Sequence, residues 1–291
     1  MIIVRLIGGL GNQLFEYALA RRLSFERRVP LKLDLSWFKD QPERPFRLDR
    51  FNIKAIPADP YEIEKLFHLE RKDLHSRLIR RLERFLPYYR RHVIYENNSG
   101  FDPSILKAPV SVYLDGYWQS PKYFSAIETV LRQDFELREP LRNERLLDLM
   151  KEIETGNSVS LHIRRGDYVQ DPKTASVHNT CPISYYQESL KLLSENESNL
   201  RVYVFSDDIQ WAEQNLHTDF PTQFVSNQLG MPDYIEMELM RRCKNHIIAN
   251  SSFSWWAAWL AANPGKTIIA PRTWFVSREA RDLIPPEWRI I

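Results

Sequence analysis

The sequence predicts an α/β protein whose two halves each contain a mostly parallel β-sheet. Short apolar runs rich in Val, Ile and Leu alternate along the chain with longer stretches of helical periodicity, as expected for parallel strands joined by helical crossovers. The chain has 291 residues, of which 43% are hydrophobic, so it is long enough for one large or two medium domains. We therefore expect packed cores and no extensive disorder.

The periodicity assigns each element in chain order. In the first half we expect strands at 2–7, 29–34 and 110–115, and helices at about 12–27, 61–68, 73–86 and 121–132. The Pro-rich stretch 42–60 is expected to be irregular. In the second half we expect strands at 158–163, 201–205, 222–226, 246–249 and 267–270, and helices at about 182–195, 208–215, 233–243 and 253–262.

A domain boundary is expected within 140–157. Glu139 and Pro140 break the preceding pattern, and a polar stretch containing Gly156 precedes the second set of strands. The predicted domains are therefore 1–150 and 151–291.

Cysteine usage and hydropathy predict a cytoplasmic protein. Cys181 and Cys243 are the two cysteines, which are too few for a disulfide framework, and neither has a second metal-type ligand at zinc spacing. The start of the chain does not have the charged and apolar regions of a secretory signal. The longest apolar run, 253–262, is about half of the ~20 residues that a membrane span needs.

One segment, 71–92, is strongly basic, with eight Arg and Lys against two acids and hence a local charge of +6. Leu74, Leu78 and Leu82 repeat at helical spacing, so the arginines between them are expected on the solvated face of an amphipathic helix. The functional alternative is peripheral contact with the inner face of an anionic membrane that presents lipid-linked acceptors. Nucleic acid is not an expected partner, because no recognisable binding module accompanies the charge.

Adjacent arginines follow the buried strand expected at 158–163, and they are the most informative feature of the chain. Arg164 and Arg165 are followed by Asp167. A guanidinium offers a planar fork of donors that matches phosphate oxygens, and a departing diphosphate needs fixed positive charge in its transition state. An isolated arginine pair more often forms ordinary ion pairs, here with Asp167, so other segments must decide between these interpretations.

Polar residues follow two further strands of the second half. Asp207 and Asp208 come directly after the strand at 201–205, and Asn250 comes directly after the strand at 246–249. Ligands of open α/β sheets bind outside the carboxyl ends of the strands. This placement favours a binding site over simple ion pairing.

The first strand ends in a glycine-rich turn that contains Gly9 and Gly11, where backbone amides can approach a ligand. This glycine turn, together with Asp34 at the end of the second strand, matches part of a dinucleotide-binding fingerprint. An NAD-type oxidoreductase is therefore one alternative. Leu14, however, occupies the third glycine position of that fingerprint. A non-catalytic glycan-binding module is a second alternative, which would explain the eight tryptophans but not the paired arginines.

Five segments, in this order, resemble the bacterial α-1,2-fucosyltransferase family, which also contains the mammalian blood-group H enzymes. They are GGLGNQLFEYA at 8–18, GYWQSPKYF at 116–124, HIRRGDYV at 162–169, VFSDD at 204–208 and CKNHIIANSSFSWWAAWLA at 243–261. The arginine motif alone is shared with α-1,6- and protein O-fucosyltransferases. The first and last segments narrow the resemblance to the α-1,2 family.

The resemblance implies a fold of the GT-B type, with two Rossmann-like domains facing across a cleft and the nucleotide sugar bound by the C-terminal one. It implies GDP-β-L-fucose as donor, the 2-hydroxyl of a terminal galactose as acceptor, and inversion at the anomeric carbon. Arg165 is expected to bind the diphosphate, and Arg164 to be partly structural and held by Asp167. The chain has no Asp-x-Asp metal clamp, so arginine is expected to replace the cation, and we expect no cofactor and no metal.

Other donor contacts follow from the resemblance position by position. His162 is expected against the nucleoside, with an ordinary core histidine as the alternative. Asp208 or Asp207 is expected on the guanine side, although Asp207 would also serve as a helix N-cap. Glu236 stands where related sequences commonly have Asp for the guanine edge, and Arg241 stands where a small Ser is expected.

The polar turn before the last of these helices is a candidate phosphate site. Asn250, Ser251 and Ser252 lie at its N-terminus, where amides and hydroxyls can bind an anion, although such residues also cap helices without a ligand. The tryptophans within the helix are expected to be core rather than sugar platforms; they are Trp255, Trp256 and Trp259.

A general base is the least determined role. The candidate carboxylates are Glu16, Asp115 and Asp171, of which Asp115 ranks first because it ends the strand at 110–115. Asn12 is expected to orient the acceptor hydroxyl or the leaving oxygen through its amide. The alternative for Asn12 is a helix N-cap with no chemical role.

Overall fold

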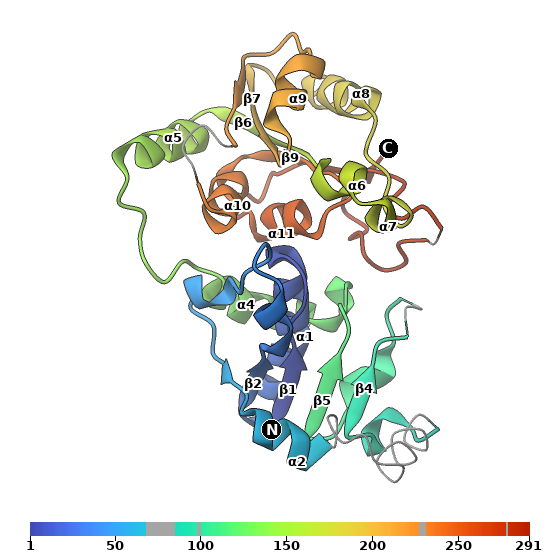
Figure 1. The fold of residues 1–291 in the computed structure, drawn as a ribbon. Coiled ribbons are helices and arrows are strands. Elements are labelled where there is room, and N and C mark those ends of the chain that lie inside the picture. Colours follow the sequence, from blue (N-terminus) through green and yellow to red (C-terminus); the bar gives the residue numbers. More distant parts are fainter. Residues whose placement is uncertain (68–84, 98–99, 227–230, 278) are drawn as a thin grey trace. The chain divides into compact units, whose positions relative to one another are not determined.

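The computed structural model describes residues 1–67, 85–97, 100–226, 231–277 and 279–291. They form two compact units, Met1–Glu139 with Arg281–Leu283, and Pro140–Ala280 with Ile284–Ile291 (Figure 1). The helix expected at 73–86 and most of the basic segment 71–92 lie outside the described residues. In the part of the chain that is described, no helix is both long enough and apolar enough to cross a membrane.

The first unit is built on a parallel sheet with the strand order β3-β2-β1-β5-β4 (Figure 1). Its strands are β1 (Ile2–Arg5), β2 (Leu31–Asp34), β3 (Ile56–Pro57), β4 (Val93–Tyr95) and β5 (Val112–Asp115). Its α-helices are α1 (Leu10–Arg27), α2 (Pro60–Phe67) and α4 (Glu128–Asp134). Short 3-10 helices cover Ser36–Asp40, Leu48–Arg50, Tyr88–Arg90, Pro103–Lys107, Pro121–Tyr123 and Ser125–Ile127.

The centre of this sheet is apolar because it is covered on both faces. Ile2, Ile3 and Val4 of β1 are all completely buried, as is typical of the middle strand of a parallel sheet. Helix α1 follows directly and buries most of its first three turns. It ends at Arg28, which adopts the left-handed conformation and donates its backbone N–H to the Phe25 carbonyl.

The second unit is built on a parallel sheet with the order β11-β10-β9-β6-β7-β8. Its strands are β6 (Asn157–Ile163), β7 (Leu200–Ser206), β8 (Thr222–Phe224), β9 (Asn245–Ile247), β10 (Ile268–Ala270) and β11 (Arg289–Ile290). Its helices are α5 (Glu144–Thr155), α6 (Gly166–Gln170), α7 (Pro172–Ala175), α8 (Ile183–Ser194), α9 (Ile209–Asn215), α10 (Asp233–Arg242) and α11 (Ser252–Leu260).

The core of the second unit lies between the central strands and the helices that connect them. Alternate residues of β6 and β7, such as Val159 and Val202, pack against Tyr186 and Leu190 of α8. The helix α11 is apolar on nearly every side. Its three tryptophans are core residues, as the sequence predicts, with exposed fractions of 8% or less.

Most predicted elements lie within two residues of the observed bounds, but the helix predicted at 121–132 is wrong over its first half. Two 3-10 turns replace it up to Ile127, and only α4 is α-helical. The chain leaves the helical conformation at Phe124, whose φ is −138° and ψ is −2°. The Arg22 guanidinium donates to the carbonyls of Lys122 and Tyr123 just before it, at 3.2 and 3.1 Å.

The stretch 140–157 contains a helix, α5, that the sequence analysis missed. Asn143 caps α5 by accepting the Leu146 N–H, and Leu146, Leu149 and Ile153 are buried at helical spacing. This pattern was readable, but the stretch was interpreted as a boundary. The strands β3, β4 and β11 were also missed, because two or three residues are too few to show an alternating pattern.

Candidate functional site

The polar residues predicted in the second unit gather at the carboxyl ends of neighbouring strands. Ile163 of β6 pairs with Ser206 of β7, so the residues that follow each strand emerge side by side. The α6 and α9 helices start from these two strand ends (Figure 1). This is the position at which open parallel sheets bind ligands.

Arg164 is held by two carboxylates. Its Nη2 donates to Asp167 Oδ1 at 2.6 Å, as predicted, and its Nη1 lies 3.0 Å from Asp207 Oδ2. The guanidinium also lies 5.5 Å from the centre of the Tyr168 ring. Arg164 is therefore fixed within the protein and positions the segment that follows β6.

Arg165 has a different environment. Its guanidinium carbon lies 3.7 Å from the centre of the Trp211 ring, and its Nε is 3.4 Å from Asp208 Oδ2. Among the residues that the structure describes, its terminal nitrogens have no hydrogen-bond acceptor. A stacked guanidinium with free terminal donors is suited to binding an oxyanion in bidentate geometry.

Asp207 and Asp208 have separate tasks. Asp207 accepts the Arg165 backbone N–H at 2.8 Å in addition to its ion pair with Arg164. Asp208 accepts the Trp211 N–H at 3.2 Å and is the N-cap of α9. The alternative that assigned the cap to Asp207 is therefore wrong, because the cap is one residue later.

Gly166 contributes to the site, although the sequence analysis gave it no role. A Cβ atom on Gly166 would lie 2.5 Å from Asp207 Oδ2 and 3.1 Å from its Cγ. The Asp207 carboxylate cannot easily move away, because Arg164 and the Arg165 N–H hold it. Glycine is thus required by close approach rather than by its backbone angles.

Glu236 joins this group from the first turn of α10. Burial raises the pKa of Glu236 to about 7, a hydrogen bond with Ser226 opposes that rise, and the carboxylates of Asp233 and Asp207 add to it. The Ser226 hydroxyl oxygen also accepts the Ser206 N–H at 2.9 Å, so its hydrogen bond with Glu236 places Glu236 beside the end of β7. Arg241 instead pairs with the buried Glu238 at 3.0 Å.

His162 is a core residue with an unusual environment. It is 4% exposed, its ring lies 5.6 Å from that of Phe253, and its Nδ1 has no hydrogen-bond partner among the described residues. Burial, reinforced by the charge of Arg164, lowers the pKa of His162 to about 3. The imidazole is therefore neutral at neutral pH.

The side chain of Asn250, in the turn at 250–252, connects two loops. The Asn250 carboxamide donates to the carbonyls of Asn179 and Trp274 at 2.7 and 3.1 Å, and Cys181 donates to its oxygen at 3.6 Å. Ser251 caps α11 through the Phe253 N–H. Asn250 thus holds two loops, and Ser251 is the N-cap of α11, as the alternative in the sequence analysis has it. Ser252 is the first residue of α11.

In the first unit, Gly8 is the glycine that the turn after β1 requires. Its φ is +75°, and a Cβ atom there would lie 2.6 Å from Asn12 Nδ2. Gly9 is the N-cap of α1 and would have no atom within 4 Å of a Cβ, whereas Gly11 lies inside the first turn of the helix. The sequence analysis singled out Gly9 and Gly11, but the constraint lies one residue earlier.

Asn12 does not cap α1. The N-cap is Gly9, and no side chain caps this helix. Asn12 Oδ1 instead accepts a hydrogen bond from Gln119 Nε2 at 3.0 Å. The capping alternative for Asn12 is therefore wrong.

Asp115 ends β5 and is 3.2 Å from the Arg5 guanidinium, with 21% of its side chain exposed. Asp34, which the dinucleotide alternative would need for a ribose, is 5% exposed. Its carboxylate already accepts the Tyr113 hydroxyl at 2.5 Å and the Ser36 N–H at 2.9 Å. This geometry opposes the oxidoreductase interpretation.

Glu16 cannot serve as a base. It is completely buried, one of its oxygens accepts the Ile7 N–H at 3.0 Å, and the other has no hydrogen-bond partner among the described residues. Burial raises the pKa of Glu16 well above its usual value, and the carboxylates of Asp115 and Glu96 raise it further, although the Ile7 bond opposes them. The charged form of Glu16 is thus disfavoured, and complete burial keeps this carboxyl away from a substrate hydroxyl.

Asp171 is also a weak base candidate. It caps α7 by accepting the backbone N–H groups of Lys173 and Thr174, both at 3.2 Å. The Thr174 hydroxyl donates to it at 2.6 Å, and these hydrogen bonds lower the pKa of Asp171. In the described parts of the chain, no three His, Cys, Asp or Glu residues are arranged to hold a metal ion.

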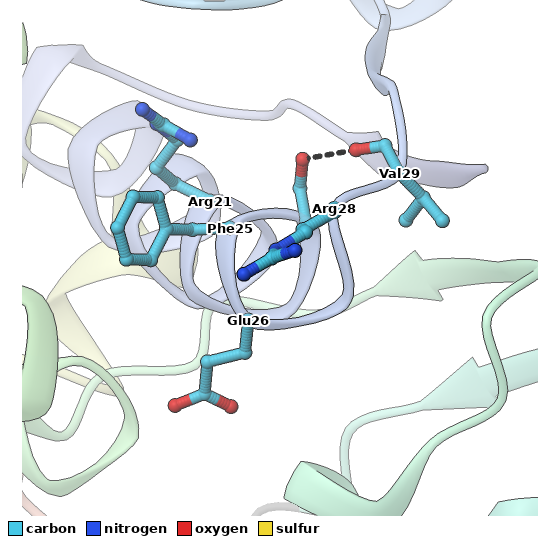
Figure 2. Close-up of a pocket in the computed structure, with 6 residues that line it drawn as sticks. Arg21, Phe25, Glu26, Arg28 and Val29 are labelled. Carbon is cyan, nitrogen blue, oxygen red and sulfur yellow. Dashed lines mark hydrogen bonds between the residues drawn. The ribbon is translucent and has the colours of Figure 1, made fainter.

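A hollow of about 500 Å³ lies at the far end of α1 from the glycine turn (Figure 2). It is lined by Arg21, Ser24, Phe25, Glu26, Arg28 and Val29. Arg21 is already paired with Asp134 at 2.7 Å, and the C-terminal end of a helix carries partial negative charge. None of the predicted site residues lines this hollow, so we assign it no role in the chemistry.

Known proteins with similar sequences are glycosyltransferases. The α-1,2-colitosyltransferase of Escherichia coli is 35% identical over 301 residues, which cover 99% of this chain and 98% of that protein. The O-antigen biosynthesis glycosyltransferase WbnK of Escherichia coli is 32% identical over 302 residues, or 97% and 98%. The galactoside 2-α-L-fucosyltransferase SEC1 of Bos taurus is 26% identical over 164 residues, or 54% and 44%.

Solved structures of fucosyltransferases have the same fold. The NodZ α-1,6-fucosyltransferase soaked with GDP-fucose matches with a TM-score of 0.51 and 16% identity, over 89% of this chain and 92% of that one. A variant of Arabidopsis thaliana FUT1 in complex with GDP matches with a TM-score of 0.52 and 14% identity, over 92% and 69%. These likenesses confirm the GT-B type of fold expected from the sequence.

The sequence model of glycosyl transferase family 11 matches residues 1–291, the whole chain. This match confirms the resemblance carried by the glycine turn and the arginine motif. The chain has paired arginines at a strand end, an acid at the start of α10 and a glycine turn after β1. It belongs to glycosyl transferase family 11.

Proposed function

We propose that this protein transfers L-fucose from GDP-β-L-fucose to the 2-hydroxyl of a terminal galactose, with inversion and without a metal ion. The observation that carries the proposal is the Arg165 guanidinium, which is stacked on Trp211 and presents its terminal donors at the carboxyl end of β6. Family membership supports the reaction class. The similarity to an α-1,2-colitosyltransferase and to a galactoside 2-α-L-fucosyltransferase supports the α-1,2 linkage.

The donor is assigned to residues 151–291. Arg165 binds the diphosphate, and Arg164 holds the segment in place through Asp167 and Asp207. Glu236, in its ionised form, accepts hydrogen bonds from the N1 and 2-amino groups of guanine. Residues 1–150 are assigned to the acceptor, with Asn12 and Asp115 near the reacting atoms.

Single displacement requires charge stabilisation on one side and proton removal on the other. As the bond between the anomeric carbon and the phosphate oxygen breaks, negative charge develops on the diphosphate, and the Arg165 fork neutralises it. In this way a fixed guanidinium supplies the positive charge that a divalent cation supplies in metal-dependent glycosyltransferases. Asp115 accepts the proton of the attacking hydroxyl, since Glu16 is completely buried.

A second nucleotide sugar is a candidate donor. The similarity to an α-1,2-colitosyltransferase, at 35% identity over nearly the whole chain, favours GDP-colitose as an alternative to GDP-fucose. Colitose is fucose without its 3-hydroxyl group, so the leaving group, the linkage and the roles given to Arg165 and Glu236 are the same for both sugars.

The test is a set of nucleotide sugars incubated with the protein and a β-galactoside. We expect GDP release from GDP-fucose or GDP-colitose that depends on the galactoside, and an α-1,2 linkage in the product by NMR. UDP-sugars serve as controls. GDP release without dependence on galactose, or a product with another linkage, would contradict the acceptor assignment.

We also propose that the protein is cytoplasmic and contacts the inner face of an anionic membrane. The described part of the basic segment carries exposed aromatic side chains beside arginines: Phe85 and Tyr89 are 83% and 54% exposed. The Arg90 and Arg91 guanidiniums lie 5.7 and 4.3 Å from tyrosine rings. Aromatic rings with neighbouring cations are suited to an anionic bilayer surface.

Vesicle flotation tests this contact. We expect binding to vesicles with anionic lipid, no binding to neutral ones, and loss of binding in a Phe85→Ser, Tyr89→Ser double variant. Val276→Ser, which replaces another exposed apolar side chain, is the matched control. Equal behaviour of the double variant and the wild type would contradict the proposal.

A further inference from the structure

The turn that follows β5 presents an aromatic side chain to solvent at the carboxyl edge of the first sheet. Tyr117 lies two residues after the end of β5, and it is 39% exposed. β5 pairs with β1, and Asp115 at the end of β5 contacts Arg5 at the end of β1 at 3.2 Å (Figure 1). Ligands of open parallel sheets bind at this edge. An exposed aromatic ring therefore lies where a substrate is expected.

The backbone of this turn is fixed by Glu96. The Glu96 carboxylate accepts the Tyr117 N–H at 2.7 Å and the Trp118 N–H at 3.0 Å, so both of its oxygens bind the turn. A Cβ on Gly116 would lie 2.3 Å from Glu96 Cβ, so the turn lies directly against this side chain. The Tyr117 ring thus starts from a backbone that is held in place.

Trp118 explains why the preceding ring stays at the surface. Trp118 is completely buried, and its ring makes an edge contact with Tyr123 at a centroid distance of 6.0 Å. Its φ is +55°, a conformation that a non-glycine residue adopts only where its surroundings enforce it, and such residues cluster at binding sites. Trp118 takes the core position of the turn, and Tyr117 is left on the solvent side.

The position of Tyr117 relative to Asp115 fits a sugar ring. The two residues are separated by one glycine, so their Cα atoms are at most about 7 Å apart. This distance is comparable to the length of one pyranose. We assign the proton of the attacking hydroxyl to Asp115, so a sugar whose 2-hydroxyl reaches Asp115 has its ring within reach of Tyr117.

We propose that the Tyr117 ring is the stacking surface for the acceptor galactose. In a β-galactoside the 4-hydroxyl is axial, so the opposite face of the ring carries the C–H groups of C3, C4 and C5. The face of an aromatic ring is electron-rich, and such C–H groups pack against it. This inference rests on the proposed function, because it takes galactose as the acceptor and Asp115 as the base.

Two substitutions separate the ring of Tyr117 from its hydroxyl. Tyr117→Ser removes both, and we expect the KM for a β-galactoside to rise about tenfold or more while the KM for the nucleotide sugar stays within about twofold. Tyr117→Phe keeps the ring and should keep the KM for the acceptor within about twofold. Both variants should melt as the wild type does, because substitution of an exposed side chain changes stability little.

Tyr61→Ser is the matched control, because Tyr61 is a more exposed tyrosine, 65% exposed, on α2 of the same unit. It should leave both KM values unchanged. A loss of general stability would change kcat and both KM values together, whereas the stacking role changes the acceptor KM alone. An unchanged acceptor KM in Tyr117→Ser, or an equal rise in Tyr117→Ser and Tyr117→Phe, would overturn the inference.

Saturation-transfer NMR tests the contact without turnover. The probe is methyl β-galactoside, added to the protein with GDP bound. We expect the protons on C3, C4 and C5 to receive the most saturation in the wild type and in Tyr117→Phe, and to lose it in Tyr117→Ser. The same pattern in Tyr117→Ser as in the wild type would overturn the stacking role and leave the proposed function standing. A wild type that neither binds nor uses a β-galactoside would overturn the galactose acceptor and this inference with it.

Discussion

Arg164 and Arg165 are adjacent in sequence, but their surroundings give them different work. Two carboxylates hold Arg164 at 2.6 and 3.0 Å, so its charge is neutralised within the protein. Arg165 contacts one carboxylate at 3.4 Å and stacks on Trp211. Stacking fixes the plane of a guanidinium without consuming its donors. Only Arg165 is therefore free to respond to charge that develops on a leaving group.

The Arg165→Lys variant tests this assignment, because it keeps the charge and loses the planar fork. We expect kcat to fall by roughly 10²-fold or more, since a point charge cannot bind two phosphate oxygens in the same geometry. Steady-state kinetics measures the change. Arg145→Lys, at an exposed position of α5, should leave kcat unchanged. Wild-type turnover in a folded Arg165→Lys protein would remove Arg165 from the site.

The second residue-scale prediction concerns Glu236, whose pKa burial raises to about 7. Since the fold raises this pKa, the contribution of Glu236 to stability is present below its unfolded value and is lost as pH rises through about 7. Guanine binding has the opposite sign, because the N–H donors of guanine need the carboxylate form. The affinity for GDP should therefore increase with pH, by roughly tenfold between pH 6 and pH 8 if only the ionised form binds.

Calorimetric titration with GDP at pH 6, 7 and 8 measures this dependence. GDP has a titrating phosphate of its own, so the comparison is with Glu236→Gln, in which only the nucleotide titrates. The ratio of the two affinities should change with pH. A constant ratio would show that Glu236 does not contact the base.

At the scale of elements, the turn between β6 and α6 depends on a close approach. Gly166 begins α6, and its missing Cβ leaves room for the Asp207 carboxylate that follows β7. Asp207 in turn accepts the Arg165 N–H. Arg165, Gly166 and Asp207 are therefore in contact, although they follow two different strands. Because Gly166 carries a hydrogen atom in place of a Cβ, Arg165 can lie this close to the end of the neighbouring strand.

Gly166→Ala should therefore displace Asp207 and reorient Arg165. We expect kcat to fall by at least about tenfold and the melting temperature to fall by a few degrees, because a Cβ within 3.0 Å of held atoms forces a rearrangement. Gly265→Ala is the matched control, since its Cβ would meet its nearest neighbour at 3.9 Å. Equal melting and turnover in the two variants would contradict this account of the turn.

The same elements show how far the sequence can be read. Buried parallel strands and the residues at their ends follow a local pattern, so β6, β7 and the predicted cluster around Arg165 could be located in advance. The contacts of Glu96 and Gln119 could not, because each joins segments separated by more than twenty residues. The sequence analysis kept Glu16 among the base candidates for the same reason: its complete burial depends on packing that no local pattern reveals.

At the scale of the whole molecule, catalysis without a cation requires the chain itself to supply the positive charge at the diphosphate. We expect turnover to be unchanged in saturating EDTA, because the Arg165 fork takes the place of the metal. The assay compares rates before and after chelation and after addition of Mn²⁺ or Mg²⁺. A loss of turnover that either ion restores would assign Asp207 and Asp208 to a metal, and the arginine account would then fail.

The division of the chain into two compact units gives the last prediction, because we assign the nucleotide to one of them. Bound GDP should raise the free energy of local opening where it makes contacts, and hydrogen exchange measures that change segment by segment. With GDP alone, we expect slower exchange in peptides covering 162–170, 204–212 and 233–240, and no change in peptides covering 8–16 and 112–120. ADP, which lacks the guanine edge, should protect 233–240 less than GDP does. Adding a β-galactoside to the GDP complex should then slow exchange at 8–16 and 112–120. Protection of 8–16 by GDP alone would move the nucleotide to the glycine turn and reverse the roles of the two units.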